Sequence, residues 1–228
     1  MRNPFGALQN AALVLCKCDD VQQRTKSCAV LGRQLSVMTR LLDDLFQATE
    51  VAVGKTRLRL ETVVVQDALE AAAGSIGPVV EQKDQELVLT LSPVPFLIEA
   101  DPSRLHQMLL NLLGNASKFT ARGGHIYLGA TVETDMAVIR VRDDGIGISA
   151  DMLPHIFELF TREETRDWTP GLGVGLAVVK ELAALHGGSV EVRSPGTGKG
   201  SVFALRLPLK QAGRVNPSGI EVDIETRR

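Results

Sequence analysis

Apolar residues recur at helical spacing along the first 55 residues. In an initial stretch these positions are Phe5, Leu8, Ala12 and Leu15. A second stretch is more regular, because its apolar or small positions alternate steps of four and three residues, as in a heptad seam. These positions are Leu31, Leu35, Met38, Leu42, Leu45, Thr49 and Ala52. The pattern predicts two helices, joined by the polar segment 18–26 and ended by Gly54.

A helical hairpin with a single apolar seam buries little surface when it is alone. We therefore predict that residues 1–55 are a dimerisation hairpin that pairs with a second copy, giving a homodimer held by a four-helix bundle. The alternative is a hairpin that packs against the rest of its own chain.

Beyond Gly54 the pattern changes to short alternating segments separated by helical ones. Extended segments are predicted at 58–60, 63–65, 86–91, 96–100, 125–134, 136–142, 189–194 and 201–207. Helices are predicted at 67–82 with Asp67 as the cap, at 101–120 with Asp101 as the cap before Pro102, at 153–160 and at 173–186. Because strands and helices do not alternate regularly, we predict an α+β fold: a two-layer sandwich with a mixed sheet covered on one face by helices. This second domain spans 56–209, and 210–228 is polar enough to be a linker or tail.

Composition removes several classes of function. The net charge of -2 and the lack of a basic stripe argue against a nucleic-acid partner. Cys16, Cys18 and Cys28 are odd in number and lack a zinc-site spacing, so we expect reduced, partly buried thiols. No apolar run approaches the ~18 residues of a membrane segment, and the first residues do not resemble a secretory signal. We expect a cytoplasmic chain, and a membrane anchor further upstream stays open.

The first motif that carries chemistry lies in the helix predicted at 101–120. Asn111 and Asn115 are four residues apart on one face of that helix, and Lys118 follows three residues later. Amide oxygens can bind Mg²⁺, and a lysine supplies a point charge for phosphate. Two asparagines on an exposed helix face would look the same, so this motif is weak by itself.

Two glycine-rich motifs follow. In Asp143-Asp144-Gly145-Ile146-Gly147 a strand ends in an acidic pair, and a carboxylate there can accept a hydrogen bond from an amine such as that of adenine. In Gly171-Leu172-Gly173-Val174-Gly175-Leu176 the glycines precede a helix, whose free N–H groups favour phosphate. The second motif does not match a Walker A loop. An ordinary Asp-Gly turn is the alternative for the first.

Taken in order, the three segments resemble the N, G1 and G2 boxes of sensor histidine kinases. Between the last two, Ile156-Phe157-Glu158-Leu159-Phe160 resembles the F box of the family. The resemblance continues through 185–188 and 200–203, and upstream 41–45 is typical of the second dimerisation helix. It covers about residues 2–209.

The resemblance implies a Bergerat-type (GHKL, HATPase_c) ATP-binding fold with a lid between the G1 and G2 boxes. It implies that Asn115 binds Mg²⁺ with Asn111 as its helper, that Lys118 contacts phosphate and that Asp143 binds the adenine amine. Gly145 and Gly147 would let adenine approach, whereas Gly171, Gly173 and Gly175 would hinge the lid, in which Trp168 lies. Phe157 and Phe160 would anchor the lid. The implied ATP-binding set also includes Phe119, Ile148, Phe160, Leu172, Val174 and Leu176.

Three departures from the family pattern stand out. Relatives carry H-E-L-R-N-P at the first dimerisation helix, and here the match begins at Arg2, so we expect the phosphate-accepting histidine to lie outside this chain. His106, His125, His155 and His186 are expected to be structural or solvent-facing. Phe119 and Asp144 replace a usual tyrosine and a usual threonine or asparagine.

The implied function is protein-histidine kinase activity, in which the γ-phosphate of ATP passes to a histidine and then to the receiver domain of a response regulator. An ATPase of the same fold is less favoured, because it would carry a glutamate where Asn111 stands. A dimeric docking module with a degenerate nucleotide site is the non-enzymatic alternative. The polar end of the chain also leaves open a receiver domain beyond Arg228.

Overall fold

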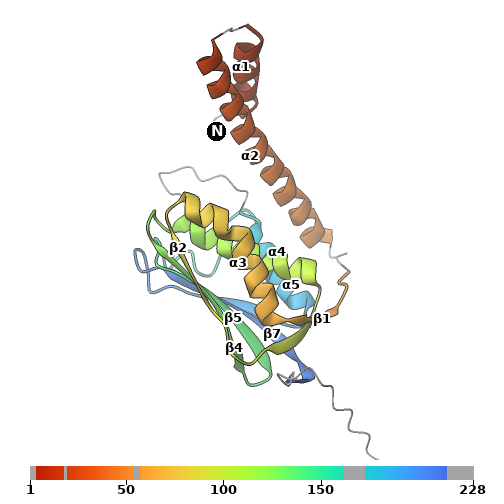
Figure 1. The fold of residues 1–228 in the computed structure, drawn as a ribbon. Helices are drawn as coiled ribbons and strands as arrows, with labels where there is room; N and C mark the ends of the chain where they lie inside the picture. Colours follow the sequence, from red (N-terminus) through yellow and green to blue (C-terminus); the bar gives the residue numbers. More distant parts are fainter. Residues whose placement is uncertain (1–3, 18–19, 54–56, 162–172, 215–228) are drawn as a thin grey trace, which may run out of the picture.

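The computed structural model describes residues 4–17, 20–53, 57–161 and 173–214. Its N-terminal part is a helical hairpin of α1 (Pro4–Lys17) and α2 (Val21–Val53), which extends away from a sheet covered by helices (Figure 1). α2 begins inside the predicted connection 18–26. Asp20 explains this early start, because its carboxylate accepts the N–H of Gln22 at 2.9 Å and its carbonyl accepts the N–H of Arg24.

Seven strands form one mixed sheet, which confirms the predicted fold class. The strand order is β1 (Glu61–Val64), β3 (Phe96–Ala100), β7 (Ser201–Arg214), β5 (Met136–Asp143), β4 (His125–Glu133) and β2 (Glu86–Thr90), with β6 (Ser189–Arg193) paired to β7. The pair β2–β4 is parallel and the other pairs are antiparallel. β5, which carries the G1 segment at its end, lies between β4 and β7 and is thus held on both edges.

Three helices cover one face of the sheet: α3 (Val65–Gln82), α4 (Pro102–Phe119) and α5 (Gly175–Leu185) (Figure 1). The core lies between these helices and the sheet. Leu109 and Leu112 of α4 are fully buried there, together with Ile139 of β5 and Leu205 of β7. Because α4 is pinned at the centre of this core, the residues on its other face have fixed positions relative to the end of β5.

Asp101 caps α4 as predicted. Its carboxylate accepts the N–H groups of Ser103 and Arg104, the Ser103 hydroxyl and the N–H of Arg59. Burial raises the pKa of Asp101, but the hydrogen bonds from Ser103, Arg59 and Arg104 outweigh it and lower the pKa from 3.8 to about 2. The buried His186 ring accepts the N–H of Asp101 through Nε2 at 3.1 Å, which ties the end of α5 to the start of α4.

Several predicted boundaries are wrong. α3 starts at Val65, directly after β1, and no side chain caps it, so Asp67 is not its cap. β7 continues to Arg214, past the predicted start of the tail at 210, because its second half pairs with β3 through Ile98–Leu209 and Phe96–Arg214.

Two further expectations also differ from the structure. Residues 153–160 form a series of turns instead of the predicted helix. Cys16 and Cys28 are exposed on the hairpin and not partly buried, whereas Cys18 lies outside the described residues.

Candidate functional site

The helix α4 places Asn111, one of the two predicted amide residues, beside the start of α5. The Asn111 side chain donates from Nδ2 to the Gly175 carbonyl at 3.3 Å. Asn115 and Lys118 lie further along α4 and are half-buried, and the Lys118 ammonium lies 4.8 Å above the centre of the Phe119 ring. The structure thus brings Asn111 of the N box and the start of the G2 helix together.

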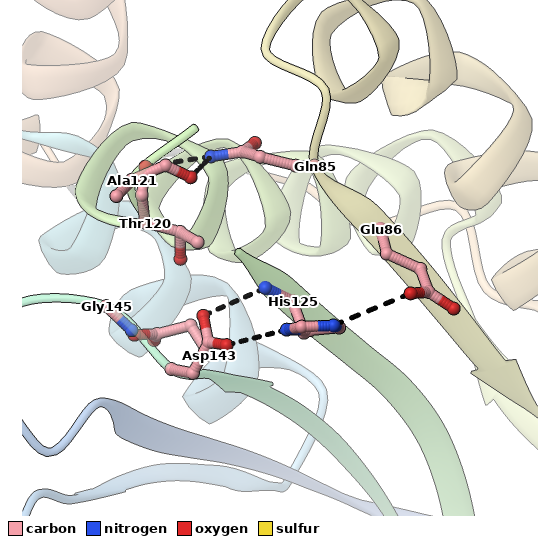
Figure 2. A network of polar contacts seen from close by, with 8 residues as sticks. Gln85, Glu86, Thr120, Ala121, His125, Asp143 and Gly145 are labelled. Atoms are coloured by element: carbon pink, nitrogen blue, oxygen red, sulfur yellow. Dashed lines mark hydrogen bonds and ion pairs between the residues drawn. The ribbon is translucent and has the colours of Figure 1, made fainter. Parts of the chain in front are cut away.

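The end of α4 is closed by a side chain from another element. Gln85, in the turn before β2, is buried, and its Nε2 donates to the carbonyls of Ser117 at 2.9 Å and Thr120 at 2.8 Å. Figure 2 shows Gln85 with Thr120 and with Ala121, whose carbonyl it also meets at 3.3 Å. Its Oε1 accepts the Ser117 hydroxyl at 2.8 Å, and Lys83 donates to the same Ser117 carbonyl at 2.6 Å. These contacts satisfy carbonyls that a helix end leaves unpaired. The sequence carried no signal for this role of Gln85.

Asp143 lies at the end of β5 and is buried. One carboxylate oxygen accepts the N–H of Gly145 at 2.9 Å, and the other accepts the Ser201 hydroxyl at 2.5 Å. The carboxylate is therefore held in one orientation by a main-chain N–H of the loop after β5 and by a hydroxyl at the start of β7. Ser201 was not among the site residues predicted from the sequence, although it lies in segment 200–203, where the chain resembles the family.

The glycines of the G1 segment are required by contacts within the protein. A Cβ atom on Gly145 would lie 2.4 Å from the Phe119 carbonyl oxygen, and one on Gly147 would lie 2.2 Å from the Gly196 carbonyl oxygen. Gly147 also has a positive φ of 68°. The expectation that these glycines exist to admit adenine is therefore not needed to explain them. Close backbone packing against α4 and against the turn after β6 is sufficient.

Asp144 turns towards the start of β4. Its carboxylate accepts the main-chain N–H of His125 at 2.8 Å and meets Nδ1 of the same ring at 2.8 Å. Burial raises the pKa of Asp144, but its contacts with the N–H and ring of His125 outweigh that effect and the pKa is lowered. On its other side His125 faces Glu86 of β2 at 3.5 Å (Figure 2). The extra negative charge expected here is thus paired with a histidine.

The segment between the G1 and G2 boxes is described from Ile148 to Thr161. Phe157 packs edge-to-face on Phe203 of β7, with ring centroids 6.4 Å apart, and its part as a lid anchor stays a prediction. Phe160 differs from the expectation because its side chain is 59% exposed. Its N–H donates to the Gly173 carbonyl at 3.1 Å, so residues on either side of 162–172 meet. Gly171, Leu172 and Trp168 lie outside the described residues.

The start of α5 differs from the start of α4. Among the described residues no side chain caps it, because the preceding residue is Val174, which is fully buried. Its first N–H groups are therefore not used by a cap. A Cβ atom on Gly175 would meet only the Asn111 amide, at an ordinary 3.5 Å. Ile148 and Leu176 pack against the edge of the core on either side of this region.

Residues 100–211 match the sequence profile of the family described as histidine kinase-, DNA gyrase B- and HSP90-like ATPases. This range contains α4, the G1 segment and α5. The domain that contains residues 100–211 therefore belongs to this family, and the match supports the ATP-binding core of a histidine kinase.

Sensor kinases are among the relatives of the chain. It is 36% identical to an uncharacterized sensor-like histidine kinase of Rhizobium meliloti (strain 1021), over 78% of this chain and 34% of that protein. It is 32% identical to the autoinducer 2 sensor kinase/phosphatase LuxQ of Vibrio harveyi, over 94% of this chain and 26% of that protein. The crystal structure of full-length ShkA in complex with AMPPNP superposes with a TM-score of 0.73 at 30% identity, over 92% of this chain and 44% of that chain.

The chain covers only part of the length of these relatives. The chain spans about a third of the first relative and about a quarter of the second, so the activity of a whole sensor protein is not transferred to it directly. None of the described helices combines the length and apolar character needed to cross a membrane. Within the same residues, no group of three or more histidine, cysteine or acidic side chains is placed to hold a metal ion.

Proposed function

We propose that the chain is the catalytic core of a protein-histidine kinase, which binds ATP with Mg²⁺ and transfers the γ-phosphate to a histidine. The observation that carries the proposal is the buried Asp143 carboxylate, held by Gly145 and Ser201 at the end of β5 beside the amide face of α4. A buried carboxylate fixed in this way can accept a hydrogen bond from the amine of an adenine ring. The matching ATPase family supports this reading.

Nucleotide binding would then use two walls. On the adenine side lie Asp143, Gly145, Gly147 and Ile148, with Phe119 at the end of α4. On the phosphate side we place Lys118 and the residues from Gly173 to Leu176, which include the uncapped start of α5. Gly171 and Leu172, which the resemblance adds to this side, are outside the described residues. The open contact at Gly175 is consistent with a ligand approaching the backbone there, since an added Cβ would meet no protein clash.

Magnesium fits this site only in company with a nucleotide. The donor chemistry that α4 offers is amide oxygen, from Asn115 with Asn111 beside it, and Mg²⁺ accepts such ligands while it keeps waters and phosphate oxygens in its shell. Bound there, the ion would offset charge on the phosphates. Asn111 already donates to Gly175, so its proposed part is to orient the site between α4 and α5.

Phosphoryl transfer depends mostly on positioning and charge. Lys118 would hold the phosphate chain for in-line attack by an imidazole nitrogen. The residue at the position of a water-activating glutamate is Asn111, which lacks the basic carboxylate needed for hydrolysis. This difference favours transfer to a histidine over simple ATP hydrolysis.

The four histidines of the chain are poor candidates for the phosphate acceptor. His186 is buried and bonded at both ring nitrogens, to Asp101 and to Leu182. His125 lies between Asp144 and Glu86, His155 faces Glu158, and His106 meets Ser75. We therefore propose that this chain does not phosphorylate itself, that the acceptor lies outside these 228 residues, and that the receiver domain of a response regulator takes the phosphate onward.

The test is calorimetric titration with a non-hydrolysable ATP analogue, with and without Mg²⁺. Asp143→Asn should weaken binding at least about tenfold, because a charge-assisted hydrogen bond is worth roughly 1.5–3 kcal/mol. Asp135→Asn, in the exposed turn between β4 and β5, is the matched control and should bind as the unmodified chain does. Phosphorylation of a separate histidine-containing dimerisation segment would then establish the kinase reaction.

Absence of binding by the unmodified chain would overturn the proposal. The remaining account would be a dimeric docking module with a degenerate site. Binding that resists Asp143→Asn would show that the nucleotide sits elsewhere on the chain.

A further inference from the structure

The turn between β6 and β7, residues 194–200, lies directly against the G1 segment, residues 143–148. The N–H of Gly198 donates to the Ile146 carbonyl at 2.6 Å, and the N–H of Gly200 donates to the Gly145 carbonyl at 3.0 Å. Main-chain bonds of this kind fix one loop against another without help from the core. The turn therefore acts as a backing layer for the segment that carries Asp143.

Two glycines make this contact possible. A Cβ atom on Gly147 would lie 2.2 Å from the Gly196 carbonyl oxygen, and one on Gly200 would lie 2.0 Å from the Asp143 carbonyl oxygen. Both glycines have φ values of 68°. Since the two backbones touch at these points, a shift of the turn would displace the G1 segment.

The side chain of Ser194 forms hydrogen bonds both to the G1 segment and within the turn. Its Oγ accepts the N–H of Ile148 at 2.9 Å and donates to the Gly200 carbonyl at 2.8 Å. The same oxygen lies 3.4 Å from the N–H of Gly196, which donates to it. One hydroxyl thus joins the end of the G1 segment to both ends of the turn.

We propose that Ser194 is a positioning residue for the nucleotide site, which holds Asp143 and its loop in the binding geometry before a nucleotide arrives. The proposal rests on the proposed function, because it assigns Ser194 a part in that same site. The physical reason is preorganisation, because a loop that is already ordered loses less conformational freedom on binding. Neither the hydrophobic pattern nor the three sequence motifs indicated Ser194.

The first experiment needs no nucleotide. Hydrogen–deuterium exchange of the unliganded chain should show faster exchange in residues 144–149 for Ser194→Ala than for the unmodified chain. Ser194→Thr keeps the hydroxyl and should restore slow exchange. Thr197→Ala, an exposed residue of the same turn, is the matched control and should change nothing.

The second experiment compares nucleotides. Loss of the Ser194 hydroxyl should weaken binding of the ATP analogue and of AMP by the same factor, about two- to tenfold, because the residue acts on the adenine side. Lys118→Ala should weaken binding of the ATP analogue much more than that of AMP. A split of this kind separates positioning of the adenine wall from contact with phosphates.

Exchange that is unchanged in 144–149 for Ser194→Ala would overturn the proposal. So would faster exchange throughout residues 57–161 and 173–214, since that would indicate general destabilisation. If the unmodified chain binds no nucleotide, the proposed function fails, and the exchange experiment still decides whether Ser194 orders the G1 segment.

Discussion

The helices of the hairpin and of the sandwich have similar amphipathic spacing, but their apolar side chains differ in burial. In the sandwich, the apolar face of α4 is fully buried at Leu105, Leu109 and Leu112. Among the described side chains of the hairpin, Ala11 is the one apolar side chain that is buried. Leu35, in contrast, is 57% exposed. A helix packed on a sheet finds a partner surface in its own chain, and a two-helix hairpin does not.

This difference explains why the hairpin is proposed as a dimerisation element. An apolar seam with an exposed residue such as Leu35 is better stabilised when another apolar surface covers it. The sandwich needs no such partner for its core. The two regions should therefore respond differently to the same kind of substitution.

Leu109→Ala should have the largest effect on the sandwich. The side chain is fully buried between α4 and the sheet, so its truncation should lower the free energy of unfolding by about 2–5 kcal/mol through lost contacts and a cavity. The change is measured by unfolding the whole chain in urea while far-UV circular dichroism monitors its secondary structure. An effect below about 1 kcal/mol would show that the core around α4 is looser than the structure indicates.

Asp101→Asn should have an intermediate effect that depends on pH. The folded pKa of about 2 lies below the ordinary value of 3.8, so the carboxylate stabilises the fold fully above about pH 4 and loses that contribution as the pH falls towards 2. At pH 6 the variant should be less stable by about 1 kcal/mol, because charge-assisted hydrogen bonds become neutral ones. Urea unfolding between pH 2 and pH 6 should show the difference shrinking towards the acid end.

The control for Asp101 is Asp67→Asn, on an exposed position of α3 that does not cap its helix. A difference between Asp101→Asn and the unmodified chain that stays constant from pH 6 to pH 2 would contradict the assigned role of the Asp101 carboxylate.

Leu35→Ala should have the smallest effect on the sandwich. The residue is exposed on the hairpin, so the free energy of unfolding of the sandwich should change by less than about 0.5 kcal/mol. The same substitution should weaken self-association measured by analytical ultracentrifugation. If neither Leu35→Ala nor Leu35→Asp changes self-association, this seam is not part of a dimer interface.

The sequence by itself determined most of the local structure. Apart from the helix wrongly predicted at 153–160, alternation and helical spacing located the described helices and strands. The pair Asp101-Pro102 located the start of α4, because such signals act over a few residues. The order of the three motifs indicated the family before any geometry was known. Some boundaries were wrong where a long-range contact decided them, as with β7, which continues to Arg214 because β3 lies beside it.

Only the tertiary structure decided how the candidate site is supported. Gln85 closes the end of α4 from 32 residues away in the chain, and Ser201 reaches Asp143 across 58 residues. Position 147 requires glycine because the backbone of the turn after β6 lies too close for a Cβ atom. No local sequence pattern reveals this contact. Contacts between distant segments depend on how the layers pack, and a single sequence records the residues that make such contacts without recording which partners they meet.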